Sequence, residues 1–245
     1  MGCSVARMTK ILPRRCFIAL TSGAIAIPSI LFAKNEVPTL LDHILLGSND
    51  LPRGIEFVEQ RTGVRAAFGG VHPGRGTQNA LLSLGERRYL EIIAPDPAQP
   101  GVKNPIASNL HSLTEPQLIG WAAHPGSVPE FAEKLRAAGI KFDGPTPGSR
   151  KRPDEQLLRW RVVSLADTAS GLLPFFIEWS QDSAHPSVDA PKGCALQSFA
   201  AETPEPEKLA ATLKTLNLDL PIKKSEKPRL HAVISGPKGN LDVYS

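Results

Sequence analysis

The chain has 245 residues, which is enough for one large domain or two small ones, and 41% of them are hydrophobic, which suffices for a core. Its formal net charge is +4, but residues 1–33 contain four basic residues and no acid, whereas the rest of the chain has 24 residues of each sign. The positive charge therefore belongs to the amino-terminal segment. The body lacks the basic footprint of a nucleic-acid-binding protein, so we expect no nucleic-acid partner.

The amino-terminal segment has the layout of an export signal. Basic residues precede the apolar run CFIALTSGAIAIPSILFA, and Arg14-Arg15-Cys16-Phe17-Ile18 resembles a twin-arginine signal. The run is borderline for a bilayer span and Pro28 interrupts it, so an uncleaved membrane anchor is the first alternative and an ordinary buried helix the second. We expect residues 1–33 to be an export signal or anchor, and the body to be periplasmic or secreted.

A pattern of one strand, a short helix opened by proline, and further strands recurs along the chain. The first copy spans residues 40–96, the second spans residues 117–181, and a shorter third occupies residues 195–245. One such unit cannot cover its own sheet, so two must pair, with a pocket between them. The sequence predicts an α+β fold in which two βαβββ modules form a curved mixed sheet over residues 34–190, followed by an appended βαβ-type unit.

Strand periodicity predicts which side chains share a face of the sheet. Alternation in the first strand places Leu41, His43 and Leu45 on one face and Asp42, Ile44 and Leu46 on the other. The same rule groups Tyr89, Glu91 and Ile93, and it groups Phe176 with Glu178. An acid within a run as apolar as FFIEW needs a partner, which favours a specific task for Glu178.

Five segments together resemble the glyoxalase-like branch of the vicinal oxygen chelate superfamily. They are Leu41-Asp42-His43, the loop GGVHPGRGTQN at residues 69–79, Tyr89–Ile93, Gly120-Trp121 and Pro174–Trp179. In that superfamily, paired βαβββ modules typically hold a divalent metal through a His on the first strand, a Glu on the fourth, and the equivalent positions of the second module. The resemblance implies His43, Glu91 and Glu178 as metal ligands. Gly120 stands at the remaining position and has no side chain to offer.

One imidazole and two carboxylates suit Zn, Mn, Fe(II) or Ni and leave open positions for a substrate. The resemblance thus implies a metal-dependent lyase, isomerase or dioxygenase that acts on a small oxygenated substrate. Glu178 and His72 are the expected catalytic residues. Gly120 favours the alternative, a metal-free protein that binds a small ligand on the same fold.

The loop at residues 69–79 supplies further candidates, because His72, Arg75 and Asn79 offer a proton-transfer group, a cation and an amide to a carbonyl or anionic substrate. Trp121 suits a pocket wall. Structural alternatives remain open: an ion pair for each acid (Glu178 with Arg159 or Arg161, Glu91 with Arg87 or Arg88), a simple hairpin for the loop, and core packing for Trp121. A third functional class, an interaction module that completes its sheets as a homodimer, also remains open.

Overall fold

The computed structural model describes residues 1–2, 36–102 and 104–245. The chain divides into a unit of residues 1–32 and a unit of residues 33–245, and the second unit contains all of the helices and strands described below. The predicted export signal or anchor lies almost entirely outside the described residues. Among the described residues, no helix is both long and apolar enough to cross a membrane.

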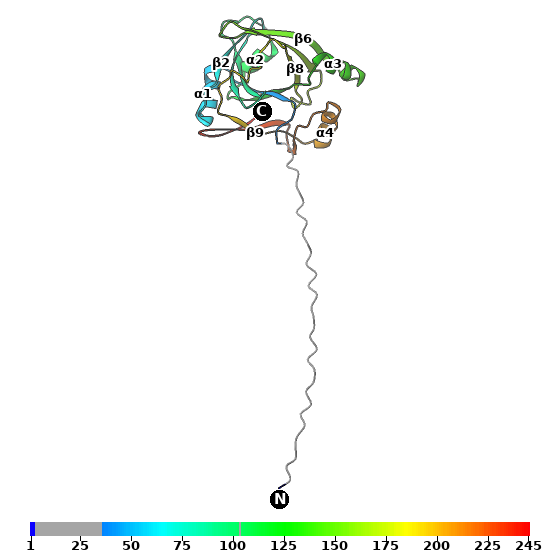
Figure 1. Ribbon diagram of the computed structural model, residues 1–245. Helices are drawn as coiled ribbons and strands as arrows, with labels where there is room; N and C mark the ends of the chain where they lie inside the picture. Colours follow the sequence, from blue (N-terminus) through cyan, green and yellow to red (C-terminus); the bar gives the residue numbers. More distant parts are fainter. Residues whose placement is uncertain (3–35, 103) are drawn as a thin grey trace. The chain divides into compact units, whose positions relative to one another are not determined.

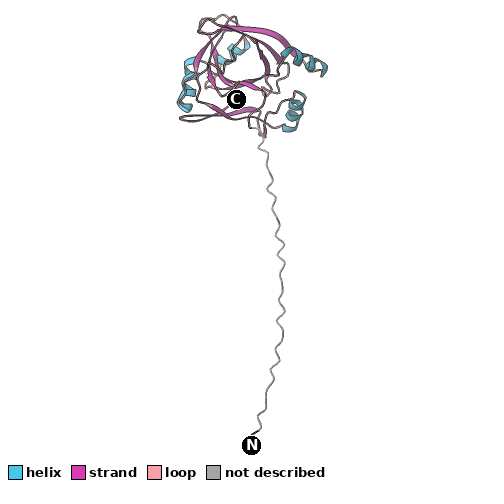
Figure 2. Ribbon diagram, viewed as in Figure 1, coloured by secondary structure: helices cyan, strands magenta, loops and turns pink. Residues whose placement is uncertain are grey.

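Two βαβββ modules form one sheet of eight strands, as the sequence predicts (Figures 1 and 2). The first module consists of β1 (Leu41–Gly47), α1 (Leu51–Thr62), β2 (Ala67–His72), β3 (Thr77–Ser83) and β4 (Tyr89–Pro95). The second consists of β5 (Gln117–Ala123), α3 (Val128–Ala137), β6 (Phe142–Lys151), β7 (Leu157–Leu165) and β8 (Phe175–Trp179). The short helix α2 (Pro105–His111) lies in the connection between them.

The strand order β2-β3-β4-β1-β5-β8-β7-β6 repeats the same topology in each module. β1 runs parallel to β4 and β5 runs parallel to β8, while β1 and β5 pair antiparallel and so join the two halves. The sheet curls until its edge strands, β2 and β6, come into contact. At this seam a Cβ on Gly70 would lie 2.5 Å from the carbonyl oxygen of Lys151, so only glycine allows the approach.

Each module helix has the proline that the sequence pattern singles out as its second residue, Pro52 in α1 and Pro129 in α3. Asp50 caps α1 by accepting a hydrogen bond from the backbone N–H of Arg53, and Gly63 ends the helix in a left-handed conformation. Leu51, Ile55 and Val58 recur at helical spacing and are buried against the sheet. The helices therefore cover the outer face of the curled sheet and leave its inner face free to form a site.

The carboxyl-terminal unit forms a separate sheet. It contains β9 (Ala195–Thr203), α4 (Pro206–Thr215), β10 (Ile222–Lys224), β11 (Arg229–Gly236) and β12 (Gly239–Tyr244), in the order β10-β9-β11-β12. β9, α4 and β10 make the predicted βαβ unit, since β9 and β10 are parallel neighbours. The unit is not a third module, because its last strand lies at the sheet edge and does not pair with its first.

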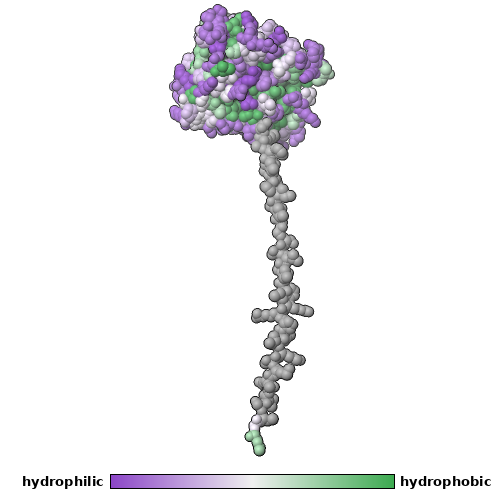
Figure 3. Space-filling view, in the orientation of Figure 1, coloured by the Kyte–Doolittle hydropathy of each residue, from purple (hydrophilic) through white to green (hydrophobic). Residues whose placement is uncertain are grey.

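The small sheet packs against the outer side of the large sheet through buried apolar side chains. Trp121 of β5 meets Phe199 of β9 with ring centroids 5.5 Å apart, and both residues belong to the main core. Figure 3 shows a mostly hydrophilic outer surface with scattered apolar side chains. The core thus lies between the two sheets, which leaves the inner face of the large sheet for a different use.

Trp121 holds the two sheets together, so its removal should destabilise the fold. We expect Trp121→Ala to lower the free energy of unfolding by about 3–5 kcal/mol, because a fully buried aromatic side chain leaves a cavity. Urea denaturation monitored by circular dichroism measures the change. Trp160→Ala is the matched control, since Trp160 is only partly buried. Equal losses in the two variants would contradict this role for Trp121.

Candidate active site

A cavity of about 180 Å³ lies on the inner face of the curled sheet. Side chains from strands of both modules line it, together with two residues at the start of α2. Its aromatic and aliphatic lining includes Tyr89, Trp160, Phe175, Ile177 and Trp179, and its polar lining includes His43, His72, Arg75, Asn79, Glu91 and Arg150. A mostly apolar cavity with a few convergent polar groups is the usual form of a small-molecule site.

Strand alternation decides which predicted residues reach this cavity. Tyr89, Glu91 and Ile93 of β4 all line it, as their shared face requires. On β8, the residues that line the cavity are Phe175, Ile177 and Trp179. The residues between them, including Glu178, face the other side of the sheet.

Glu178 is therefore not brought to the site, and its predicted metal-binding and catalytic roles do not fit its position. It does share a face with Phe176, as predicted, but that face packs toward α3. Its Oε2 accepts a hydrogen bond of 2.9 Å from the backbone N–H of Val128, the first residue of α3. A carboxylate at a helix amino terminus satisfies a free N–H group and interacts favourably with the helix dipole. This contact, rather than an ion pair with Arg159 or Arg161, is the partner of the acid in FFIEW.

Trp121 is not brought to the site either, although we expected it to bind substrate. It is 1% exposed, packs between the two sheets, and donates a hydrogen bond of 2.9 Å to the carbonyl oxygen of Leu172. Its strand position faces the small sheet. The tryptophans that do line the cavity are Trp160 and Trp179.

An irregularity in β1 changes the face on which Asp42 lies. The pairing of β1 with β5 shifts between Leu41 and His43, as in a β-bulge. The side chain of Asp42, which simple alternation assigns to the opposite face, reaches His43 on the same side, with Oδ1 2.7 Å from His43 Nδ1. The bulge thereby places an acid directly behind the imidazole.

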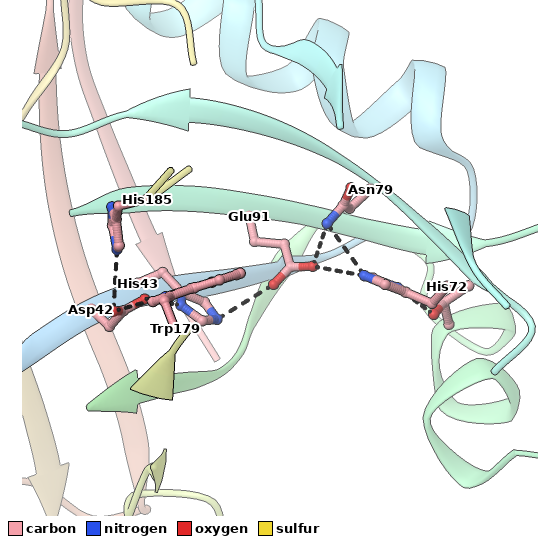
Figure 4. Close-up of polar contacts among 8 residues, drawn as sticks. Asp42, His43, His72, Asn79, Glu91, Trp179 and His185 are labelled. Atoms are coloured by element: carbon pink, nitrogen blue, oxygen red, sulfur yellow. Dashed lines mark hydrogen bonds and ion pairs between the residues drawn. The ribbon is translucent and has the colours of Figure 1, made fainter. Parts of the chain in front are cut away.

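Asp42 is a buried carboxylate with three partners. Besides His43, its Oδ2 lies 3.2 Å from His185 Nε2 and accepts a hydrogen bond of 3.2 Å from Trp179 Nε1 (Figure 4). Burial opposes ionisation of Asp42, but the hydrogen bonds from His185 and His43 outweigh it and hold its pKa below the ordinary value. His185 was missed by sequence reasoning, because it lies in the connection between β8 and β9, and no motif or spacing marks it.

Glu91 lies at the centre of the polar cluster (Figure 4). One carboxylate oxygen is 3.4 Å from His43 Nε2; the other accepts a hydrogen bond of 2.7 Å from Asn79 Nδ2 and is 3.8 Å from His72 Nε2. Burial opposes its ionisation, but the two histidines, followed by Asn79 and Arg150, hold the pKa of Glu91 below its ordinary value. Glu91 is thus an ionised carboxylate in a largely apolar cavity.

His72 closes the cluster on the side of the loop between β2 and β3. Its Nδ1 lies 2.9 Å from Thr77 Oγ1, and burial lowers the pKa of the ring. A histidine with a lowered pKa is neutral at pH 7, so one ring nitrogen can donate while the other accepts. The structure thus brings together four of the candidate residues, His43, Glu91, His72 and Asn79, and Arg75 also lines the cavity.

The residues present do not provide the four-ligand metal site of the superfamily. Of the four expected positions, His43 and Glu91 point into the cavity, Glu178 points away, and Gly120 has no side chain. Across the part of the chain that the structure describes, no group of three or more His, Cys, Asp or Glu side chains is arranged to hold a metal ion.

The buried acid behind His43 should make stability depend on pH. Because the pKa of Asp42 is lower in the folded chain than in the unfolded one, its contribution is complete above the unfolded value of about 4 and is lost as the pH falls below it. We expect Asp42→Asn to lower the free energy of unfolding at pH 7 by about 2 kcal/mol. The variant should also lose less stability than the wild type between about pH 5 and pH 3, a range that brackets the ordinary carboxyl pKa of about 4. Urea denaturation at each pH measures both effects.

Glu115→Gln is the control for this pH series, because Glu115 is exposed and, among the described residues, pairs with Arg53 on the surface. That variant should follow the wild-type pH dependence. Parallel pH profiles for the wild type and Asp42→Asn would contradict a lowered pKa at Asp42.

Comparisons with known proteins agree with this fold. The family described as "Glyoxalase-like domain" matches residues 41–217. A solved structure of a hypothetical protein from Staphylococcus aureus is similar, with a TM-score of 0.56, 13% identity, and 83% of each chain covered. Methylmalonyl-CoA epimerase from Mycobacterium tuberculosis is similar at a TM-score of 0.42 and 19% identity, over 58% of this chain and 88% of the epimerase. Among curated proteins, no sequence matches. The match over most of the chain shows that this protein belongs to the glyoxalase-like domain family, within the vicinal oxygen chelate superfamily.

Proposed function

We propose that the chain is an enzyme of the isomerase or lyase type that transfers a proton to or from a carbon atom beside a carbonyl group of a small substrate. The observation that carries the proposal is the position of Glu91, a buried carboxylate that lines the cavity between two histidine Nε2 atoms. A buried, ionised carboxylate that lines a mostly apolar cavity can act as a general base. The epimerase among the structural neighbours is too distant to bear on the choice of reaction.

In the proposed reaction, Glu91 takes the proton from the carbon, and negative charge develops on the carbonyl oxygen. The low pKa of Glu91 makes it a weak base, so hydrogen bonds to that oxygen must supply much of the driving force. His72 flanks the carboxylate and can donate such a bond from Nε2–H, while its Nδ1 accepts from Thr77. Return of the proton to the carbon gives an isomerase, whereas expulsion of a neighbouring group gives a lyase.

Asp42 is a positioning residue in this scheme, because it contacts His43 and not the cavity. Its carboxylate accepts from Nδ1–H of His43, which fixes the ring and leaves Nε2 directed at Glu91. Asn79 fixes Glu91 in the same way through a hydrogen bond of 2.7 Å. Both contacts keep the reacting groups in place before a substrate enters.

Hydrogen exchange at carbon tests this proposal without knowledge of the natural substrate. The purified chain in D₂O is incubated with hydroxyacetone, dihydroxyacetone, pyruvate and 2-oxobutanoate, and ¹H NMR follows loss of the signal beside the carbonyl. We expect catalysed exchange for at least one compound and a loss of about 100-fold or more in Glu91→Gln, since removal of a general base typically costs this much.

Glu178→Gln is the matched control, because it makes the same chemical change outside the cavity and should retain exchange. No exchange above buffer with any compound would overturn the enzymatic proposal. A second candidate function would then remain, a protein that binds a small ligand without turnover. The absence of a donor at Gly120 and the outward position of Glu178 favour it, because the cavity then has only two of the four metal-binding groups of the superfamily.

We also propose that the body is exported through the twin-arginine pathway. The support is the sequence Arg14-Arg15-Cys16-Phe17-Ile18 before an apolar run. In a bacterium that has this pathway, the full chain should appear in the periplasmic fraction, and replacement of both Arg14 and Arg15 by Lys should retain it in the cytoplasm. Arg7→Lys is the control. Equal fractionation of all three proteins would contradict this route.

A further inference from the structure

Arg150 is a buried cation on the inner side of the sheet seam. It lies on β6 and is only 3% exposed, whereas its neighbour Lys151 is exposed. Arginine is almost never fully buried unless it is paired, because removing its charge from water is costly. The buried charge of Arg150 therefore requires a compensating partner.

Within the described residues, no carboxylate lies within ion-pair distance of Arg150. Its hydrogen bond in the described part of the chain runs from Nη1 to the carbonyl oxygen of Gly69 across the seam. A guanidinium has five N–H donors, so one neutral acceptor leaves most of its capacity unused. Asn79 Oδ1 is the one fully buried polar side-chain atom without a partner among the described residues, so the unused donors of Arg150 are not sealed in the core.

Arg150 borders two hollows, and their contents differ. One is the cavity that contains Glu91; the other lies outside the seam and contains Asp154 and Asp189. Both of these acids are already engaged by Arg152, at 3.2 Å and 2.6 Å. The outer hollow thus gives Arg150 no counter-ion, and the cavity is the place where one could bind.

The charges around the cavity are unequal. Arg150 and Arg75 line it with two positive charges, and neither has an ion-pair partner among the described residues. Glu91 is the one acid in the lining, and it is occupied by His43 and Asn79. A second negative group would therefore be stabilised in this cavity, chiefly by the buried Arg150, since Arg75 is exposed to solvent.

We propose that the cavity binds small organic carboxylates and that Arg150 binds the carboxylate group. A guanidinium presents two parallel N–H groups that match the two oxygens of a carboxylate. The inference rests on the proposed function for its second part: the carbonyl-bearing carbon of the same molecule then lies toward Glu91. The substrate class is thus a small carboxylic acid that carries a carbonyl group.

Paired ligands of equal shape test the proposal on the wild-type protein. Calorimetric titration compares pyruvate with pyruvamide and benzoate with benzamide, up to high millimolar concentration. We expect each acid to bind at least 10-fold more tightly than its amide. Equal affinity within both pairs, or no binding of either acid, would overturn the proposal without any need for a variant.

Variants then assign the preference to Arg150. In Arg150→Gln the acids should lose their advantage while the amides bind as in the wild type. Arg159→Gln is the matched control, because Arg159 is exposed, pairs with Asp182 and does not line the cavity. Arg150 also bridges the seam, so thermal unfolding is recorded for each variant, and Arg150→Lys replaces Arg150→Gln if the latter is unfolded. Arg150→Lys should keep the positive charge but bind the acids more weakly than the wild type does. A full preference in a folded Arg150 variant would overturn the assignment.

The two proposals can fail separately. Binding of acids without hydrogen exchange would retain the carboxylate site and reject the enzyme. Exchange on neutral carbonyl compounds without any preference for acids would retain the enzyme and reject the carboxylate site. The wild-type titrations and the exchange assay together distinguish these outcomes.

Discussion

The antiparallel pairing of β1 with β5 is the constraint on which the rest of the structure depends. It joins two βαβββ modules into one sheet, and the right-handed twist of the strands then curls that sheet. Helices cover its outer face and the carboxyl-terminal sheet adds a second cover, which gives the chain a dry core on that side. On the inner face, side chains from both modules and from the start of α2 converge on a cavity instead of a core.

Burial of charge shapes this cavity. Asp42 and Glu91 are both buried carboxylates, and each is compensated by histidines and by a neutral N–H donor: Trp179 for Asp42, Asn79 for Glu91. These contacts within the protein offset the free-energy cost of removing the two carboxylates from water. Arg150 differs, because its partner within the protein is a single carbonyl oxygen. The contrast between paired acids and an underused cation is the physical basis for proposing a negatively charged ligand.

The sequence predicted one half of the site better than the other. On β4, a hydrophobic strand with one acid, alternation correctly grouped Glu91 with Tyr89 and Ile93. On β8 the same rule correctly grouped Glu178 with Phe176, but no feature of the sequence says which face of that strand is the inner one. An apolar run supplies core residues to both faces, so its one acid can lie on either. Glu178 faces outward because it accepts a hydrogen bond from the first backbone N–H of α3, and the sequence does not show where that helix end lies.

The sequence by itself determined the paired modules and the helix boundaries, because these follow from periodicity and from proline and glycine positions. It also named His72 and Asn79 as candidates by residue chemistry, and His43 and Glu91 through the family resemblance. Tertiary structure alone decided the roles of Asp42, His185, Arg150 and Trp121. A bulge moved Asp42 beside His43, a distant connection delivered His185, and closure of the sheet buried Arg150. Packing of a second sheet turned Trp121 into core. Each of these outcomes depends on contacts between segments far apart in the chain, and local sequence patterns carry no record of such contacts.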